Sequence, residues 1–156
     1  MPEDLKKGVW IGNLEGTLLE SSACEKQTNG VFNNVEAIQE VLETLHFKAF
    51  VLANNHLLDA GDYAVSAQNL NHIDVQGVGA GSNIEEASQY VDVTDTDGTI
   101  YRILAFGWDC IECQYAGTGR QGVNPYKKKH IFDLVKAALD TNVRLICFFH
   151  WNYELE

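Results

Sequence analysis

The residues best suited to chemistry in this sequence follow a short apolar run, Ala49 to Ala53, whose pattern predicts a strand buried on both faces. Asn54, Asn55 and His56 come directly after this run, and open α/β sheets bind their ligands at the carboxyl ends of the strands. Asp59 lies three residues beyond His56, so its carboxylate could orient the imidazole ring. For this motif alone, the favoured interpretation is a polar turn between strand and helix, with Asp59 as a local cap.

Two further apolar runs end in side chains of the same kind. Gly8 to Gly12 is followed by Asn13 and Glu15, and Val143 to Phe149 is followed by His150. Carboxylate, amide oxygen and imidazole together suit manganese, iron or zinc. A structural zinc site would use thiolates, and no cysteine stands at these positions. The repetition at three strand ends predicts a divalent metal site.

The three strands are expected to lie side by side, because ligand-binding groups collect at one edge of an open α/β sheet. We therefore predict that the strands around Val9, Phe50 and Leu145 belong to one sheet. The side chains expected at the same edge of that sheet are Glu15, His56 and His150.

Length and charge restrict the class of protein. The 156 residues and 46% apolar content predict one domain. A net charge of −11 opposes binding to nucleic acid or to anionic lipid and favours cations. No apolar run approaches the ~20 residues of a membrane span, and the start, MPEDLKKG, lacks the profile of a signal peptide. The scattered cysteines suggest no disulfide framework and are expected to be reduced thiols: Cys24, Cys110, Cys113 and Cys147.

Helical periodicity separates the first two strands. Val35 to Leu45 carries apolar residues at helical spacing, and Asn34 is placed to cap this helix. A second helix is predicted from about Asp62 to Asn71. The order of elements is therefore βαβα.

The second half of the chain predicts a hairpin and a short helix. Tyr90 to Thr94 and Thr99 to Phe106 resemble strands, and Asp97-Gly98 between them is a strong turn signal. This antiparallel pair is expected to join the sheet. Ser82 and Glu85 have the spacing of a capping box that begins a helix of one or two turns.

Two segments are predicted to be loops. Thr17 to Gly30 is polar without a clear period, and Trp108 to Tyr126 is long, glycine-rich and irregular, as functional loops often are. The second segment contains Cys110 and Cys113, a single C-x-x-C pair that is more often structural than functional. Three lysines from Lys127 to Lys129 then begin a helix, either as a solvated face or facing an anionic substrate.

Four motifs together resemble the poly-γ-glutamate capsule synthesis family, the CapA-like branch of the calcineurin-like metallophosphoesterases. They are GNLEG at 12–16, LANNHLLDAG at 52–61, GVGAGSNIEEA at 77–87 and HWNYE at 150–154. The resemblance covers most of the chain. It implies an α/β fold in which a mixed β-sheet with flanking helices forms part of a four-layer αββα sandwich with two β-sheets.

The resemblance also implies a two-metal site of manganese, iron or zinc ions at the strand ends. Glu15 resembles the bridging carboxylate with Asn13 beside it, and Asn55 resembles the amide ligand. His56 resembles the histidine that assists the leaving group, and His150 a further metal ligand. The implied substrate is anionic, either a phosphoester or a γ-glutamyl polymer, and capsule-synthesis partners in the membrane are compatible with a family that is often membrane-anchored or exported.

The chain departs from the family pattern at both ends. Family members usually carry an aspartate-rich metal motif on an earlier strand and a later glycine-histidine motif. Neither is found here, so we expect the single domain at 1–156 to be either a segment of a longer protein or a reduced form. For these residues alone we expect one weakly bound cation and no hydrolysis. The leading hypothesis is a metal-dependent phosphoesterase-like domain, and the alternative is a non-catalytic accessory component of polymer synthesis or export.

Overall fold

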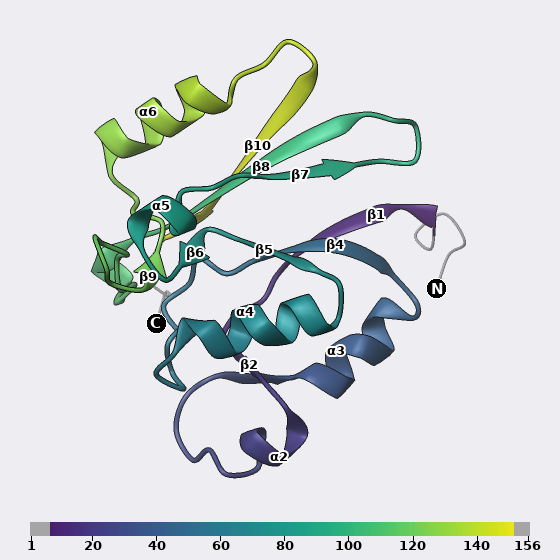
Figure 1. Ribbon diagram of the computed structural model, residues 1–156, viewed down its shortest axis with the longest axis vertical. Coiled ribbons are helices and arrows are strands. Elements are labelled where there is room, and N and C mark those ends of the chain that lie inside the picture. The colour runs from purple at the N-terminus through teal and green to yellow at the C-terminus, as the bar shows by residue number, and fades with distance from the viewer. Residues whose placement is uncertain (1–6, 152–156) are drawn as a thin grey trace, which may run out of the picture.

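Two three-stranded β-sheets face each other in residues 7–151, the part of the chain that the computed structural model describes (Figure 1). Their strands are β1 (Val9–Asn13), β4 (His46–Val51), β5 (Gln76–Val78), β7 (Val91–Thr94), β8 (Ile100–Gly107) and β10 (Val143–His150). The first sheet has the order β1-β4-β5 and is parallel throughout. The second has the order β10-β8-β7, in which β10 runs parallel and β7 antiparallel to β8.

Helices cover the outer faces of both sheets and complete four layers. The helices α3 (Val35–Leu42) and α4 (Tyr63–His72) lie outside the first sheet, and α6 (Lys128–Ala138) lies outside the second (Figure 1). The predicted α/β fold with a mixed sheet and flanking helices is confirmed. Among the helices of residues 7–151, none is long and apolar enough to cross a membrane.

The expectation that the three site strands share one sheet was wrong. Val9 and Phe50 lie in the first sheet, whereas Leu145 lies in the second. Apolar runs such as Val143–His150 indicate a buried strand, but their composition does not say which neighbour supplies the hydrogen bonds. β10 pairs along its whole length with β8 and thus continues the sheet that the hairpin begins.

The core is divided by the second sheet. In β8, Ile103 and Ala105 face the first sheet and join the main apolar cluster, while Leu104 and Phe106 face α6 and join a smaller one. This alternation follows from the two-residue period of a strand. Because both faces of β8 are covered, its sequence shows no alternation of apolar and polar residues.

Most predicted turns and caps are found in the structure. As predicted, Asn34 caps α3 by accepting a hydrogen bond from the N–H of Ala37 at 3.1 Å. Asp62, the approximate start predicted for the next helix, is its cap and accepts the N–H of Ala64 at 2.9 Å. The β7–β8 hairpin turns at Gly98, whose φ of 83° requires the left-handed conformation that glycine favours. Since β7 pairs only with β8 in the described sheets, the hairpin joins the second sheet.

Two local predictions needed correction. The helix α5 (Ile84–Ala87) is capped by Asn83, one residue later than predicted, and the Glu86 carboxylate accepts the N–H of Ser82 at 3.0 Å. Asn83 and Glu86 have the same capping spacing as Ser82 and Glu85, so the sequence offered two overlapping boxes.

The segment 17–30 is not wholly a loop. It contains β2 (Thr17–Leu19) and the one-turn helix α2 (Ser21–Cys24), and β2 pairs in parallel with β3 (Phe32–Asn34). Leu18 in β2 is also held by α4, because Ser66 accepts its N–H at 3.0 Å. Three residues are too few for periodicity to reveal a strand.

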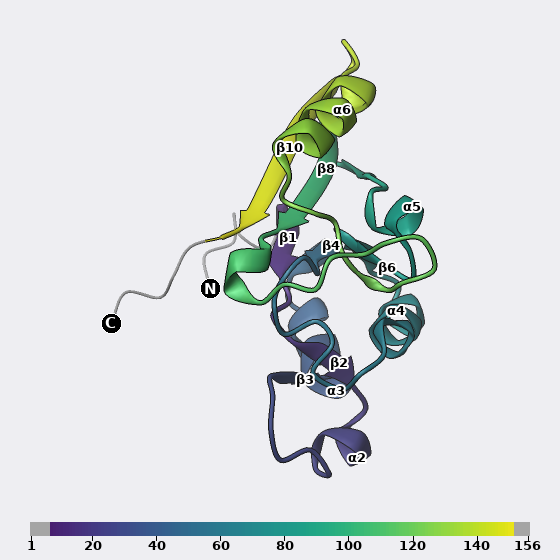
Figure 2. The same ribbon diagram turned by 90° about the vertical axis from the view of Figure 1, so that its left-hand side faces the viewer.

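The segment 108–126 is largely irregular, as predicted. It contains the short 3-10 helix η1 (Asp109–Ile111) and the strand β9 (Gly122–Val123), which pairs with β6 (Ala80–Gly81). η1 follows directly from the carboxyl end of β8 (Figure 2). This segment therefore lies beside the strand ends where the predicted site residues collect.

Candidate functional site

The two sheets meet at a contact between Asn55 and His150. Asn55 follows β4 of the first sheet, His150 ends β10 of the second, and their Oδ1 and Nε2 atoms lie 3.0 Å apart. The residues are 95 positions apart in the sequence. The carboxyl ends of β4 and β10 thus lie at the same edge of the sandwich, although the strands belong to different sheets.

The neighbouring amide, Asn54, is a structural residue. Its side chain is 1% exposed, its Oδ1 accepts the N–H groups of Gly16 at 3.2 Å and His56 at 3.1 Å, and its Nδ2 donates to the carbonyl of Leu14 at 2.9 Å. These bonds tie the loop after β1 to the loop after β4. Asn54 and Asn55 are chemically identical, so the sequence could not show which of the two is buried.

His56 is oriented by Asp59, as the sequence predicted. Its Nδ1 lies 2.9 Å from Oδ2 of Asp59, and the two side chains are 33% and 22% exposed. A carboxylate only accepts hydrogen bonds, so Nδ1 carries the proton and Nε2 is left for a ligand. Asp59 also accepts the N–H of Val31 at 2.7 Å, which fixes the carboxylate in place.

Thr17 also holds the His56 loop, and the sequence analysis missed this role. Its side chain is fully buried, and its hydroxyl donates to the carbonyl of Leu57 at 3.0 Å and accepts from the N–H of Ala60 at 3.2 Å. The only signal in the sequence was a small hydroxyl residue directly after the GNLEG motif. The loop that presents His56 is therefore anchored at both ends.

Asn13 and Glu15 lie at the same end of the first sheet but remain apart from the Asn55–His150 contact. Asn13 is opposite Val51 in the strand register, and both Asn13 and Glu15 are exposed. Within residues 7–151, no described side-chain hydrogen bond joins either of them to Asn55 or His150. The structure thus places all the predicted ligands at one edge and brings two of them into contact.

Cys113 packs beside this edge as a buried thiol. Burial raises its pKa to about 12, a hydrogen bond from the backbone of Trp108 opposes this rise, and the negative charges of Asp109 and Glu15 add to it. Its sulfur fills the space next to Gly107, where an added Cβ would lie 2.9 Å from Sγ. A protonated thiol in a packed position is a core residue, whereas Cys110 is exposed.

Two of the predicted ligands, an amide and an imidazole, contact each other at this edge. Within residues 7–151, no group of three or more histidine, cysteine, aspartate or glutamate side chains is placed to hold a metal ion. Asn55 Oδ1 can only accept a hydrogen bond, so His150 Nε2 carries the proton in this contact. The two atoms would become an amide-oxygen and imidazole-nitrogen ligand pair of the kind that borderline divalent ions accept once that proton moves to Nδ1.

Comparison with known protein families identifies the chain. A family model described as bacterial capsule synthesis protein PGA_cap matches residues 5–156. The chain belongs to this family. The match includes both sheets and every predicted site residue, so the resemblance to the capsule synthesis family that the four motifs carried is confirmed. A search of curated proteins finds no significant match.

Proposed function

We propose that this capsule synthesis family member carries a phosphoesterase-like site at the strand edge, in which Asn55 and His150 hold one divalent cation. The observation that carries the proposal is the 3.0 Å approach of Oδ1 and Nε2 from two different sheets. An amide and an imidazole brought together at strand ends are suited to ligand binding. The net charge of −11 favours binding of a cation at this edge. The same charge repels an anionic substrate, so a bound cation would be needed to offset that repulsion.

His56 is the residue of this chain best placed to move a proton. Asp59 holds its Nδ1–H at 2.9 Å, so Nε2 can donate a proton to a leaving oxygen once the ring is charged. A bound divalent cation would polarise a phosphoryl oxygen and lower the pKa of bound water. Glu15 and Asn13, exposed at the same edge, would complete the coordination of the cation, and Asn54 keeps the loops in position.

Manganese binding tests the cation site. Titration followed by electron paramagnetic resonance should show one Mn²⁺ per chain, held weakly, and both Asn55→Ala and His150→Ala should remove it. Asp97→Asn is a matched control, because Asp97 lies in the distant β7–β8 turn. Binding that survives both substitutions at the strand edge would refute the assignment.

A non-catalytic accessory role in polymer synthesis or export is the second candidate. It is favoured by the lack of a three-ligand acidic or histidine cluster in residues 7–151, since catalytic metals commonly keep about three protein ligands each. Hydrolysis of bis(p-nitrophenyl) phosphate in manganese separates the two candidates. We expect these 156 residues alone to stay at the background rate. Turnover that His56→Ala abolishes would establish the catalytic role, and metal-dependent binding of an anionic polymer without turnover would establish the accessory one.

A further inference from the structure

Aromatic side chains gather beside the candidate site, at the carboxyl ends of β8 and β10. Tyr126 is at their centre, with its ring centroid 6.0 Å from that of Trp108, 5.6 Å from Phe149 and 6.2 Å from Trp151. Phe149 is 41% exposed and Trp151 is 60% exposed. We name Tyr126, Phe149 and Trp151 the aromatic platform.

The platform continues the α6 side of β10 beyond the cover of the helix. Leu145 and Cys147 of β10 pack against α6, and the strand period places Phe149 on the same side. Trp151 follows the strand directly and stacks on Tyr126. α6 begins at Lys128 and leaves these last two rings exposed. His150, between them, points the other way to Asn55, so the platform and the candidate site are the two faces of one strand end.

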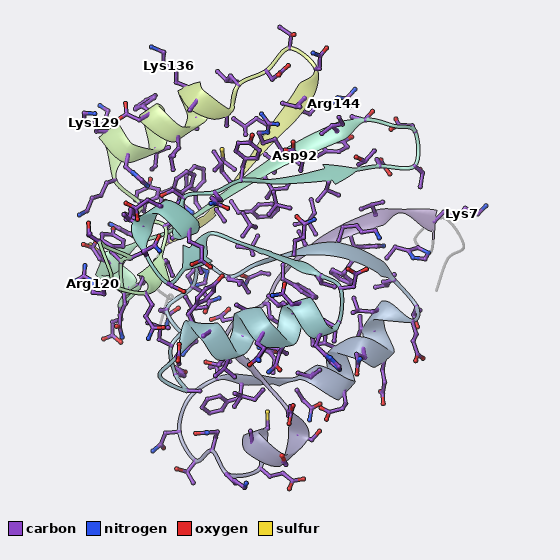
Figure 3. The ribbon with its side chains drawn as sticks, viewed as in Figure 1. Lys7, Asp92, Arg120, Lys129, Lys136 and Arg144 are labelled. Atoms are coloured by element: carbon purple, nitrogen blue, oxygen red, sulfur yellow. The ribbon has the colours of Figure 1, made fainter. Side chains whose placement is uncertain are left out.

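Lysines directly follow Tyr126 of the platform in the sequence, at the start of α6. Lys127 and Lys128 are exposed, and Nζ of Lys127 lies 4.9 Å above the ring of Tyr115. Lys129 is paired with Asp133 at 2.6 Å, whereas Lys127 and Lys128 form no ion pair within residues 7–151. Figure 3 shows Lys129 at the start of α6 and Lys136 further along the same helix.

The positive end of the helix dipole disfavours these lysines at the start of α6. The first turn of a helix carries positive partial charge, so consecutive lysines there destabilise the helix. In a chain with 22 acidic and only 11 basic residues, such a local conflict is expected mainly at functional positions. Exposed aromatic rings close in sequence to cations that form no ion pair within residues 7–151 suit a ligand that has both a flat apolar face and a negative charge.

We propose that the aromatic platform, together with Lys127 and Lys128, binds a carboxylated pyranose ring of an anionic glycan. The C–H groups on one face of a pyranose carry partial positive charge and are attracted to the negative face of an aromatic ring. The ring carboxylate then meets the two lysines. A flexible γ-glutamyl chain offers carboxylates but no flat face, and ordering it costs more conformational entropy. An anionic membrane is disfavoured by the net charge of −11.

This inference rests on the proposed function only in placing an anionic polymer at this edge, and binding to the platform requires no metal. Calorimetric titration of the full chain with a uronate hexasaccharide, in the presence of EDTA, tests it directly. Trp151→Ala should weaken binding by about tenfold and Trp151→Phe should restore most of it. Replacing Lys127 and Lys128 by glutamine should weaken binding by about tenfold at low salt and less at high salt.

Two exposed positions on α6 provide matched controls. Phe132→Ala removes a ring that is 64% exposed, and Lys136→Gln removes a cation further along α6 than Lys127 and Lys128; neither should change the affinity. A neutral glucan hexasaccharide should bind at least about fivefold more weakly.

Three outcomes would overturn the proposal. They are uronate binding that is insensitive to Trp151→Ala, tighter binding of a γ-glutamyl oligomer of equal charge, and Trp151-dependent binding to anionic lipid vesicles in place of the glycan. Asn55→Ala distinguishes the two proposals, because it should abolish manganese binding and leave uronate binding in EDTA unchanged.

Discussion

Asn54 provides the sharpest test of how the site is held. Asn54→Ala removes a side chain that is 1% exposed and leaves the N–H groups of Gly16 and His56 without their acceptor. A buried donor without a partner costs about 1–3 kcal/mol, and two such donors, one only partly buried, should lower the free energy of unfolding by about 3 kcal/mol. For a domain of this size that corresponds to a fall in Tm of about 6–12 °C.

The adjacent residue is the natural control for this substitution. Asn55 is only partly buried and its described hydrogen bond is the one to His150, so Asn55→Ala should cost about 1 kcal/mol or less. Urea denaturation followed by circular dichroism measures both variants, and the slope m should match that of the wild type. If Asn54→Ala loses less than Asn55→Ala, the division into a structural amide and a ligand amide is wrong.

Charges and thiols away from Asn54 respond in three predictable ways. Lys128→Glu should raise the free energy of unfolding by about 0.5 kcal/mol, because it replaces a cation at the positive end of α6, and urea denaturation at low salt should show a gain that 1 M salt removes. Iodoacetamide at pH 7.5 should alkylate the exposed Cys110 well before Cys113, whose pKa burial raises to about 12; equal rates in a mass-spectrometric time course would contradict this. Burial lowers the pKa of His130 from 6.5, although Asp133 opposes the shift. The stability that neutral His130 contributes is therefore present above pH 6.5 and is lost as the pH falls through the lower folded pKa. His130→Gln should reduce this loss, and denaturation measured between pH 7 and pH 5 would show it.

The sequence predicted elements better than it predicted their pairing. Asn34, Asp62 and Gly98 mark helix starts and a hairpin through local hydrogen bonds or backbone conformation, and each was found at its expected place. The pairing of β10 with β8 depends on contacts between residues about 40 positions apart. An apolar run records only that a strand is buried, so it could not separate one sheet from two.

The candidate site was predictable as a set of residue types but not as a set of contacts. Strand-end positions of Asn55, His56 and His150 followed from the pattern of apolar runs, because parallel strands present their carboxyl ends at one edge. The paths of the loops decide which amide is buried and whether Glu15 reaches the Asn55–His150 pair. No local signal in the sequence encodes those paths. Thr17 was missed for the same reason, since its partners lie about 40 positions away.

A site divided between two sheets links ligand binding to the packing of the sandwich. Asn55 and His150 approach each other only when the inner faces of the sheets are in contact, and apolar residues such as Ala105 hold that interface. A cation that binds both side chains must therefore favour the packed state over any state in which the sheets separate, by RT ln(1 + [L]/Kd). By the same linkage, a substitution that loosens the interface between the sheets weakens cation binding without touching a ligand. The proposed site thus depends on buried residues of the interface as directly as on the polar residues at its edge.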